Sequence, residues 1–248
     1  MTMSQANTVI DIENLNKSFG QNHVLKDFSM NLRRGENLAI LGKSGSGKSV
    51  LIKCIINLIE ADSGKIDVLG NSIGELNQEA LDQLRAKVGF LFQSNALYDS
   101  MTVRENLEFP LRIHWTKERK QKEGEHAIMN ALHDVGLAHT IDMMPAELSG
   151  GMRKRIALAR TLILQPQIIL YDEPTTGLDP VTSREISRLM VSIREKYNAS
   201  SVIISHDLSC INITADRVIM LIDGCAYANN TIGELKRSPD PKITEFFD

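Results

Sequence analysis

Two glycine-rich segments of the sequence are suited to binding anions. The first, GKSGSGKS at residues 42–49, follows the apolar run NLAIL and precedes a run with helical spacing. It matches the pattern G-x-x-x-x-G-K-[ST], in which backbone N–H groups at a helix start surround phosphates. The second, ELSGGMRKR at residues 147–155, also has glycines at an expected helix start. We interpret Ser149 as the N-cap of that helix, with Gly150 and Gly151 allowing an anion to approach closely, although a tight turn alone would also use two glycines.

The first segment predicts separate roles for its residues. Lys48 is expected to reach the β- and γ-phosphates of a nucleotide, and the Ser49 hydroxyl is expected to bind Mg²⁺. Gly42, Gly45 and Gly47 permit the positive φ angles that turn successive N–H groups inward. The other residues of the loop are assigned to the same bound nucleotide: Lys43, Ser44 and Ser46.

A second candidate metal ligand follows a buried strand. The segment IILYDEP at residues 168–174 is apolar up to Asp172, which places this carboxylate at the carboxyl end of a strand, where open α/β sheets bind ligands. We expect Asp172 to bind the same Mg²⁺ as Ser49. Glu173 is then placed to orient or deprotonate the attacking water. By itself an Asp-Glu pair after a strand is more often a solvated turn, but the phosphate-binding segment favours the catalytic interpretation.

The composition is that of an ordinary globular chain. The 248 residues are 42% hydrophobic and 24% charged, and the net charge of −3 argues against a nucleic-acid partner. No apolar run reaches the roughly 18–20 residues that span a bilayer, and residues 1–13 show no secretion signal. Cys54, Cys210 and Cys225 lack metal-ligand spacing, so we expect reduced thiols in apolar surroundings. A cytoplasmic protein is predicted.

Short apolar strands alternating with helices predict an α/β fold with a mainly parallel sheet that is covered on both faces. The stretch from about 75 to 165 is predicted to be mainly helical, and we interpret it as an insertion into one domain. The expected strands are 8–19, 23–36, 37–41, 65–69, 167–174, 201–207 and 217–224. The expected helices are 48–61, 77–88, 118–135, 152–164 and 183–197.

In their order along the chain, these motifs resemble those of the ATP-binding-cassette (ABC) ATPases over essentially the whole sequence. The order also includes Gln93, the segment TTGLDP after Glu173, and His206 at the end of an apolar run. The resemblance implies a single cassette over residues 1–248. Its parts would be a P-loop core with a mainly parallel sheet, an N-terminal antiparallel β-subdomain and a helical subdomain inserted at about 94–165. It also implies a homodimer in which each ATP lies between the P-loop of one chain and the signature motif of the other.

The resemblance assigns further residues to the bound ATP and Mg²⁺. Glu173, His206 and Gln93 correspond to catalytic positions, and Phe19 falls where the family stacks an aromatic ring, more often Tyr, on adenine. The resemblance makes Asp179 the last residue of the D-loop, the segment 177–179, and assigns it to nucleotide binding. His206 alone would be interpreted as an ordinary core histidine; with the other motifs it is expected to hydrogen-bond the γ-phosphate. The implied Mg²⁺ ligands are Ser49, Gln93 and Asp172, and the signature motif is Leu148–Met152.

A cassette without membrane spans must transfer its motion to another protein. DNA-repair ABC ATPases insert a long coiled coil, for which the 55 positions from Gln93 to Leu148 leave no room, and translation-associated ABC factors carry two cassettes. A separate membrane permease is therefore the expected partner, in two copies. An apolar patch after Gln93 is available to dock it, although these residues can equally pack inside the helical lobe: Ala96, Leu97, Tyr98 and Met101.

Two segments narrow the transporter class. LFQSNALYDSMTV and MPAELSGGMRKRIALAR are similar to the ATPases of MCE-type phospholipid transporters, such as the maintenance-of-lipid-asymmetry systems, whose signature ends in Met as at Met152. Asn95 and Lys43 depart from the Gly and Pro expected there. The resemblance implies a peripheral subunit on the cytoplasmic face of a Gram-negative-type inner membrane, held by the permease. Further partners would be an MCE-domain lipid-binding protein and a small cytoplasmic regulatory subunit, with glycerophospholipid as the cargo moved between inner and outer membranes.

An importer ATPase for polar amino acids is the alternative. Methionine- and sugar-type importer ATPases often carry an added C-terminal regulatory domain, whereas only 42 residues follow His206 here. Many polar amino-acid importers also lack that domain, so this class stays open.

Overall fold

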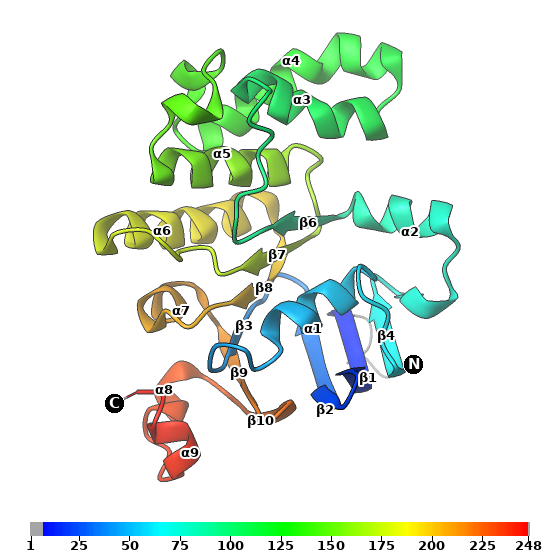
Figure 1. Ribbon diagram of the computed structural model, residues 1–248. Coiled ribbons are helices and arrows are strands. Elements are labelled where there is room, and N and C mark those ends of the chain that lie inside the picture. The colour runs from blue at the N-terminus through cyan, green and yellow to red at the C-terminus, as the bar shows by residue number, and fades with distance from the viewer. Residues whose placement is uncertain (1–6, 248) are drawn as a thin grey trace.

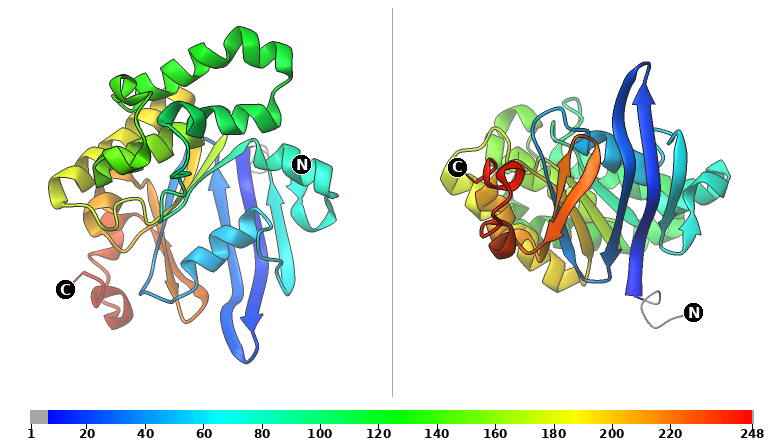
Figure 2. Two further views of the ribbon diagram at one scale, coloured as in Figure 1. Left: turned by 45° about the horizontal axis from the view of Figure 1, so that its top comes forward. Right: turned by 90° about the horizontal axis from the view of Figure 1, so that it is seen from below.

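The computed structural model describes residues 7–247. The interpretation of the N-terminus falls largely on residues 1–6, outside the described part. The first sheet along the chain is antiparallel and has the strand order β2-β1-β4-β5 (Figure 2). Its long hairpin buries alternate residues such as Ile10 and Phe28, which is the pattern of a sheet with one covered face. The strands are β1 (Thr8–Phe19), β2 (Asn22–Arg33), β4 (Ser63–Val68) and β5 (Asn71–Ser72).

The core is a six-stranded sheet in the order β10-β9-β3-β8-β7-β6, parallel except for the β10–β9 pair. Every residue of β3, β7 and β8 is buried, as expected for apolar strands covered on both faces. The expected α/β fold with an antiparallel N-terminal sheet is therefore confirmed. The strands are β3 (Asn37–Leu41), β6 (Val88–Leu91), β7 (Ile168–Asp172), β8 (Ser200–Ile204), β9 (Arg217–Ile222) and β10 (Cys225–Asn230).

Helices cover both faces of the core sheet (Figure 1). The helix α1 (Lys48–Ile55) shares a hydrophobic cluster with the antiparallel sheet and one core face, which includes Leu170 of β7. The next residue of β7, Tyr171, points to the other face and packs with α6 (Pro180–Tyr197). The predicted helix 48–61 is too long, because Asn57 adopts a left-handed φ of 52° and the N–H of Leu58 caps the helix on Lys53 O at 2.9 Å.

Three helices form a lobe above the core: α3 (Val103–His114), α4 (Lys117–Asp134) and α5 (Gly150–Leu162) (Figure 1). The lobe has no separate core, since Leu107 of α3 and Ile156 of α5 belong to the same hydrophobic cluster as Tyr171. Short 3₁₀ turns lie at Ile73–Glu75, Ala138–Thr140 and Pro145–Glu147, and the remaining helices are α2 (Gln78–Arg85), α7 (Leu208–Thr214), α8 (Ile232–Leu235) and α9 (Pro241–Thr244). Among residues 7–247, no helix has the length and apolar character needed to cross a membrane.

Two strands of the core sheet were not predicted. The stretch 75–165 was expected to be mainly helical, yet residues 88–91 form β6, because their backbone pairs with β7 and Gly89 packs against α5. A four-residue run carries no period that could separate strand from helix. The strand β10 was missed because its sequence, CAYANN, is rich in Ala and Asn, which are uncommon in strands, and because it lies at an exposed edge. The cysteine prediction is wrong for Cys225, which is exposed on β10, while Cys54 and Cys210 are buried and burial raises the pKa of each thiol to about 11.

Candidate nucleotide site

The loop between β3 and α1 has the geometry of an anion site. Gly45 and Gly47 adopt φ angles of 77° and 102°, and Gly47 is the N-cap of α1 with no side chain capping the helix. The first turn of α1 contains no acidic residue, so its N–H groups and the positive end of the helix dipole remain for a bound anion. A side chain at Gly47 would collide with β2, because an added Cβ would lie 2.7 Å from Cγ1 of Val24.

Lys48 is a buried cation at this helix start. Its Nζ donates hydrogen bonds to the carbonyl oxygens of Gly42 at 2.8 Å and Lys43 at 2.9 Å, and the residue is 7% exposed. Burial lowers the pKa of Lys48, and the nearby charges of Glu173 and Asp172 oppose this shift. Within residues 7–247 no carboxylate forms an ion pair with it. A nucleotide phosphate would supply the missing counter-charge.

The carboxyl end of β7 adds oxygen ligands suited to Mg²⁺. Ser49 Oγ donates a hydrogen bond to Asp172 Oδ1 at 3.0 Å, which joins α1 to β7. Burial raises the pKa of Asp172, and the charge of Glu173 raises it further, whereas the bond from Ser49 lowers it. A hydroxyl, a carboxylate and phosphate oxygens form a typical Mg²⁺ set. These residues therefore fit the implied ion, which when bound would neutralise charge on the phosphates.

Glu173 leaves the strand through an unusual backbone conformation. Its φ is 50°, and its N–H donates to Ile204 O at 2.9 Å on the neighbouring strand. The carboxylate thereby turns toward His206, whose Nδ1 lies 2.8 Å from Glu173 Oε2. The hydroxyl of Thr176 donates to the same oxygen at 3.1 Å. Glu173 is held in place while its partner His206 stands mostly in solvent.

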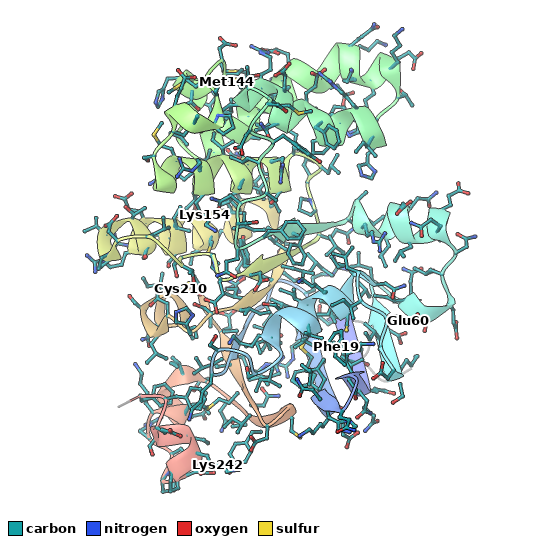
Figure 3. All side chains as sticks on the ribbon, in the orientation of Figure 1. Phe19, Glu60, Met144, Lys154, Cys210 and Lys242 are labelled. Atoms are coloured by element: carbon teal, nitrogen blue, oxygen red, sulfur yellow. The ribbon has the colours of Figure 1, made fainter. Side chains whose placement is uncertain are left out.

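Lys48, Ser49, Glu173 and His206 all line one open cleft of about 520 Å³, whereas Asp172 is not part of its wall. Gln93, just after β6, lines it opposite the loop, and Phe19 at the end of β1 stands at the antiparallel-sheet side with 49% of its surface exposed (Figure 3). Lys17 Nζ lies 5.3 Å from the centre of the Phe19 ring. The predicted residues in the cleft wall are Phe19, Ser44, Gly45, Gly47, Lys48, Ser49, Gln93, Glu173 and His206.

The second glycine segment lines a different cleft, of about 480 Å³, with which the first shares no residue. Ser149 is the N-cap of α5, and its Oγ accepts a hydrogen bond from Met152 N at 3.2 Å. Asp179 is the N-cap of α6, and Gly151 packs so closely on that helix that an added Cβ would lie 2.7 Å from Thr182 Cγ2. One chain therefore does not bring Ser149, Gly150, Gly151 or Asp179 to its own phosphate loop.

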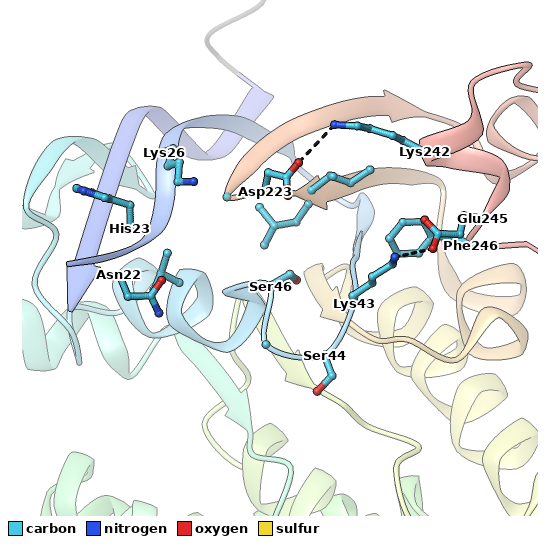
Figure 4. Close-up of a pocket in the computed structure, with 15 residues that line it drawn as sticks. Asn22, His23, Lys26, Lys43, Ser44, Ser46, Asp223, Lys242, Glu245 and Phe246 are labelled. Carbon is cyan, nitrogen blue, oxygen red and sulfur yellow. Dashed lines mark hydrogen bonds and ion pairs between the residues drawn. The ribbon is translucent and has the colours of Figure 1, made fainter. Parts of the chain in front are cut away.

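Two residues of the phosphate loop point away from the nucleotide cleft. Lys43 Nζ pairs with Glu245 Oε1 at 2.7 Å and lies 5.9 Å from the ring centre of Phe246, both in the C-terminal segment (Figure 4). Lys43 and Ser46 both line a separate cleft of about 460 Å³ beside the nucleotide cleft. Gly42 lies directly against Ser46, because a Cβ added to Gly42 would be 2.6 Å from Ser46 Oγ. Neither Lys43 nor Ser46 lines the nucleotide cleft to which the sequence analysis assigned them.

The predicted docking patch is divided between the surface and the lobe. Tyr98 is 42% exposed and packs against Phe109, with the two rings tilted by 55° and their centres 4.9 Å apart. Leu97 packs against the lobe's hydrophobic cluster. Ala96 and Met101 are half-buried.

Lys154 is a residue of the site that the sequence analysis missed. It is 2% exposed, and its Nζ donates to the backbone oxygen of Gln93 at 3.1 Å. Burial lowers the pKa of Lys154 to about 8, against the opposing charge of Asp172. The available signal was its position in the helical run 152–164, where Ala157 and Leu158 lie on the same face three and four residues later.

Comparison with known proteins decides the family. The sequence profile of the ABC transporter family matches residues 25–176, which is more than half of the chain. The chain belongs to the ABC transporter family. This cassette is 38% identical over 96% of its length to the probable ribonucleotide transport ATP-binding protein mkl of Mycobacterium leprae, of which it spans 68%. It is 36% identical over the same share to the glutamate/glutamine/aspartate/asparagine transport ATP-binding protein BztD of Rhodobacter capsulatus, of which it spans 89%.

Solved cassettes have the same fold. The cbiO1 structure from Clostridium perfringens, part of the ABC transporter complex cbiONQ, superposes with a TM-score of 0.84 at 30% identity and covers 92% of this chain and 90% of its own. A dimeric ATP-binding cassette in a post-hydrolysis state with ADP and phosphate gives a TM-score of 0.79 at 30% identity, covering 90% and 98%. The cassette is therefore an ATP-hydrolysing transporter subunit of a class that dimerises and works with a membrane permease.

Proposed function

We propose that two copies of this cassette close around two ATP molecules and drive phospholipid transport between the inner and outer membranes. The observation that carries the composite site is the separation of the two clefts. Lys48 and Glu173 line one cleft, whereas Ser149 and Gly151 line the other, so a second chain is needed to complete each nucleotide site. The relative solved as a dimer with ADP and phosphate supports this arrangement.

Each residue of the nucleotide cleft has a role in this proposal. Lys48 binds the β- and γ-phosphates, and Ser49 and Asp172 hold Mg²⁺ together with Gln93. Glu173 accepts a proton from the attacking water, since its carboxylate is held at the cleft wall. His206 keeps the Glu173 carboxylate in place at 2.8 Å and contacts the γ-phosphate. Phe19 stacks on adenine, and Ser149, Gly150, Gly151 and Asp179 contact the nucleotide of the partner chain.

The phospholipid cargo rests on two sequence features, the segment LFQSNAL after β6 and Met152 at the end of the signature motif. We infer that residues 1–248 act as a single cassette, held by two permease copies on the cytoplasmic face of the inner membrane. An MCE-domain protein and a small regulatory subunit complete the proposed complex. We propose that Tyr98, which is exposed, contacts the permease together with the neighbouring Leu97.

Import of polar amino acids is the second candidate. It is favoured by the similarity to the transport protein BztD, of which this chain spans 89%, more than it spans of mkl. The two functions differ in the partner protein and in the cargo.

The complex itself tests the cargo. The cassette is purified with its native permease in mild detergent, and the co-eluting proteins and lipids are identified by mass spectrometry. Bound glycerophospholipid together with an MCE-domain protein is the expected result. A periplasmic amino-acid-binding protein without bound phospholipid would overturn the lipid function and support the second candidate.

A further inference from the structure

The buried cation Lys154 connects the signature helix to the nucleotide cleft of the same chain. It lies on α5 where the lobe meets the core sheet (Figure 3), four residues after Gly150 at the helix start. Its ammonium makes a single hydrogen bond within residues 7–247, to Gln93 O at 3.1 Å. No carboxylate of the described chain lies within ion-pair distance of it.

A buried ammonium without a paired carboxylate is costly. Its neighbours on the same face of α5, Ala157 and Leu158, are 1% and 0% exposed, so packing alone would favour an apolar side chain here. The Lys154 ammonium instead donates a hydrogen bond to one backbone oxygen, in the loop that contains Gln93. Packing does not explain a lysine at this position, but the hydrogen bond does.

The loop after Gln93 needs support from outside. Asn95 and Ala96 adopt left-handed φ angles of 64° and 52°, a conformation that is unfavourable for most non-glycine residues and persists when the surroundings hold it. A second cation of α5, Arg160, donates to Asn95 O at 3.4 Å. The helix α5 therefore contacts this loop at two carbonyl oxygens, which belong to Gln93 and Asn95.

We propose that Lys154 is a positioning residue that fixes the backbone of Gln93 and thereby sets the reach of its side chain toward Mg²⁺. Because the N-terminus of α5 belongs to the second cleft, a nucleotide bound there by the partner chain would also act on Gln93 through Lys154. This inference rests on the proposed role of Gln93 as a Mg²⁺ ligand.

The test compares three variants of the full chain. Lys154→Met removes the donor and keeps the length, whereas Lys154→Gln keeps a donor without the charge. Arg237→Met is the control, because Arg237 is also a cation that donates to a backbone oxygen, Gly233 O at 3.1 Å, and it lines neither cleft. Hydrogen exchange of the backbone amides of residues 92–98, measured without nucleotide, reports how firmly the loop is held. The Mg²⁺ concentration that gives half-maximal binding of fluorescent ATP, the Mg²⁺ midpoint, reports the metal site.

Lys154→Met is expected to speed exchange at 92–98 and to raise the Mg²⁺ midpoint about tenfold, since the charge-assisted hydrogen bond that holds the Gln93 backbone is lost. Lys154→Gln should recover part of both effects, and Arg237→Met should show neither. Unchanged exchange and an unchanged midpoint in Lys154→Met would overturn the positioning role. Should Lys154→Met fail to fold, Lys154→Leu takes its place in the same comparison.

Gln93→Ala separates this inference from the function on which it rests. A raised Mg²⁺ midpoint in Gln93→Ala supports the metal role, and an unchanged midpoint overturns that role whatever Lys154 does. Faster exchange in Lys154→Met alongside an unchanged Gln93→Ala midpoint would keep the contact to the Gln93 backbone and remove its link to the metal.

Discussion

The imidazole Nδ1 of His206 lies 2.8 Å from Oε2 of Glu173. Glu173 is 8% exposed, and its carboxylate also accepts a hydrogen bond from Thr176 at 3.1 Å. The positive φ of Glu173, 50°, brings this acid out of the β7 line and toward the cleft. The pair therefore places a held carboxylate beside the phosphate loop, with an exposed imidazole next to it.

Glu173→Gln should bind ATP normally and hydrolyse it about 10²–10⁴ times more slowly, because the amide cannot accept the proton of the attacking water. Steady-state phosphate release and nucleotide binding, measured on the same preparation, check both parts. Thr176→Val removes only one supporting hydrogen bond and should slow turnover far less. Wild-type turnover in Glu173→Gln would exclude Glu173 as the general base.

Mixed dimers should regain activity that neither parent has. Lys48→Ala disables the first cleft of a chain, and Gly150→Glu disables its second cleft. A dimer containing one chain of each kind still has one complete site, formed by the intact first cleft of one and the intact second cleft of the other. ATPase assays of the mixture should exceed both single variants. Mixtures that stay inactive, although mixed dimers form, would argue for nucleotide sites within single chains.

Gly47→Ala should weaken ATP binding about tenfold or more. The φ of 102° is strained for alanine by about 1–3 kcal/mol, and the new Cβ would lie 2.7 Å from Val24 Cγ1. Gly45→Ala is the matched control, since Gly45 also has a positive φ but an added Cβ meets nothing within 4 Å. Isothermal titration with ATP should therefore show a smaller loss for Gly45→Ala. Equal affinities in the two variants would contradict the collision with β2.

The contact between the two sheets should show a defined pH dependence. Glu36 precedes β3, and its Oε1 accepts a hydrogen bond from Arg217 Nε of β9 at 2.7 Å. Burial raises the pKa of Glu36, but the bonds from Arg217 and Arg33 outweigh it and leave the pKa below the usual 4.5. The charged form therefore stabilises the fold at pH values above 4.5, and this stabilisation is lost as the pH falls through the lower folded-state pKa.

Glu36→Gln should accordingly lower the free energy of unfolding at neutral pH by about 1–3 kcal/mol, because Arg217 loses a charged partner. The difference between wild type and variant should shrink below pH 4.5. Urea unfolding at pH 7 and at pH 3.5 measures both values. A difference that grows on acidification would show that the carboxylate is not held charged by Arg217.

Sequence patterns predicted the parts of this fold that have a long period or an unambiguous motif. The loop 42–49 and the helices near 118–135 and 152–164 lie as expected, because each is specified locally. The sequence analysis missed the strand β6 within a stretch predicted to be helical, because those four residues form a strand only by pairing with β7. The strand β10, rich in Ala and Asn, is likewise held by its neighbour β9.

The site was predicted by residue type, but the directions of its side chains were not. Nothing in the sequence shows that Lys43 pairs with Glu245, which is 202 positions away and reaches the loop only after β10 turns the chain back. The contact of Lys154 with Gln93 spans 61 positions and depends on how the lobe sits on the core. Such contacts follow from tertiary packing, which local spacing does not encode.

The strands β6 and β7 are neighbours in the core sheet, and the helical lobe leaves the sheet after one of them and returns through the other. The lobe is thus joined to the body by a double hinge on one side, close to Gln93 and Asp172. Movement of the lobe relative to the sheet would displace Gln93 directly, whereas the loop carrying Lys48 follows β3, which β8 and β7 separate from β6. A force applied to α3 or α4 by another protein would in this way move a proposed Mg²⁺ ligand without displacing the loop that binds the phosphates.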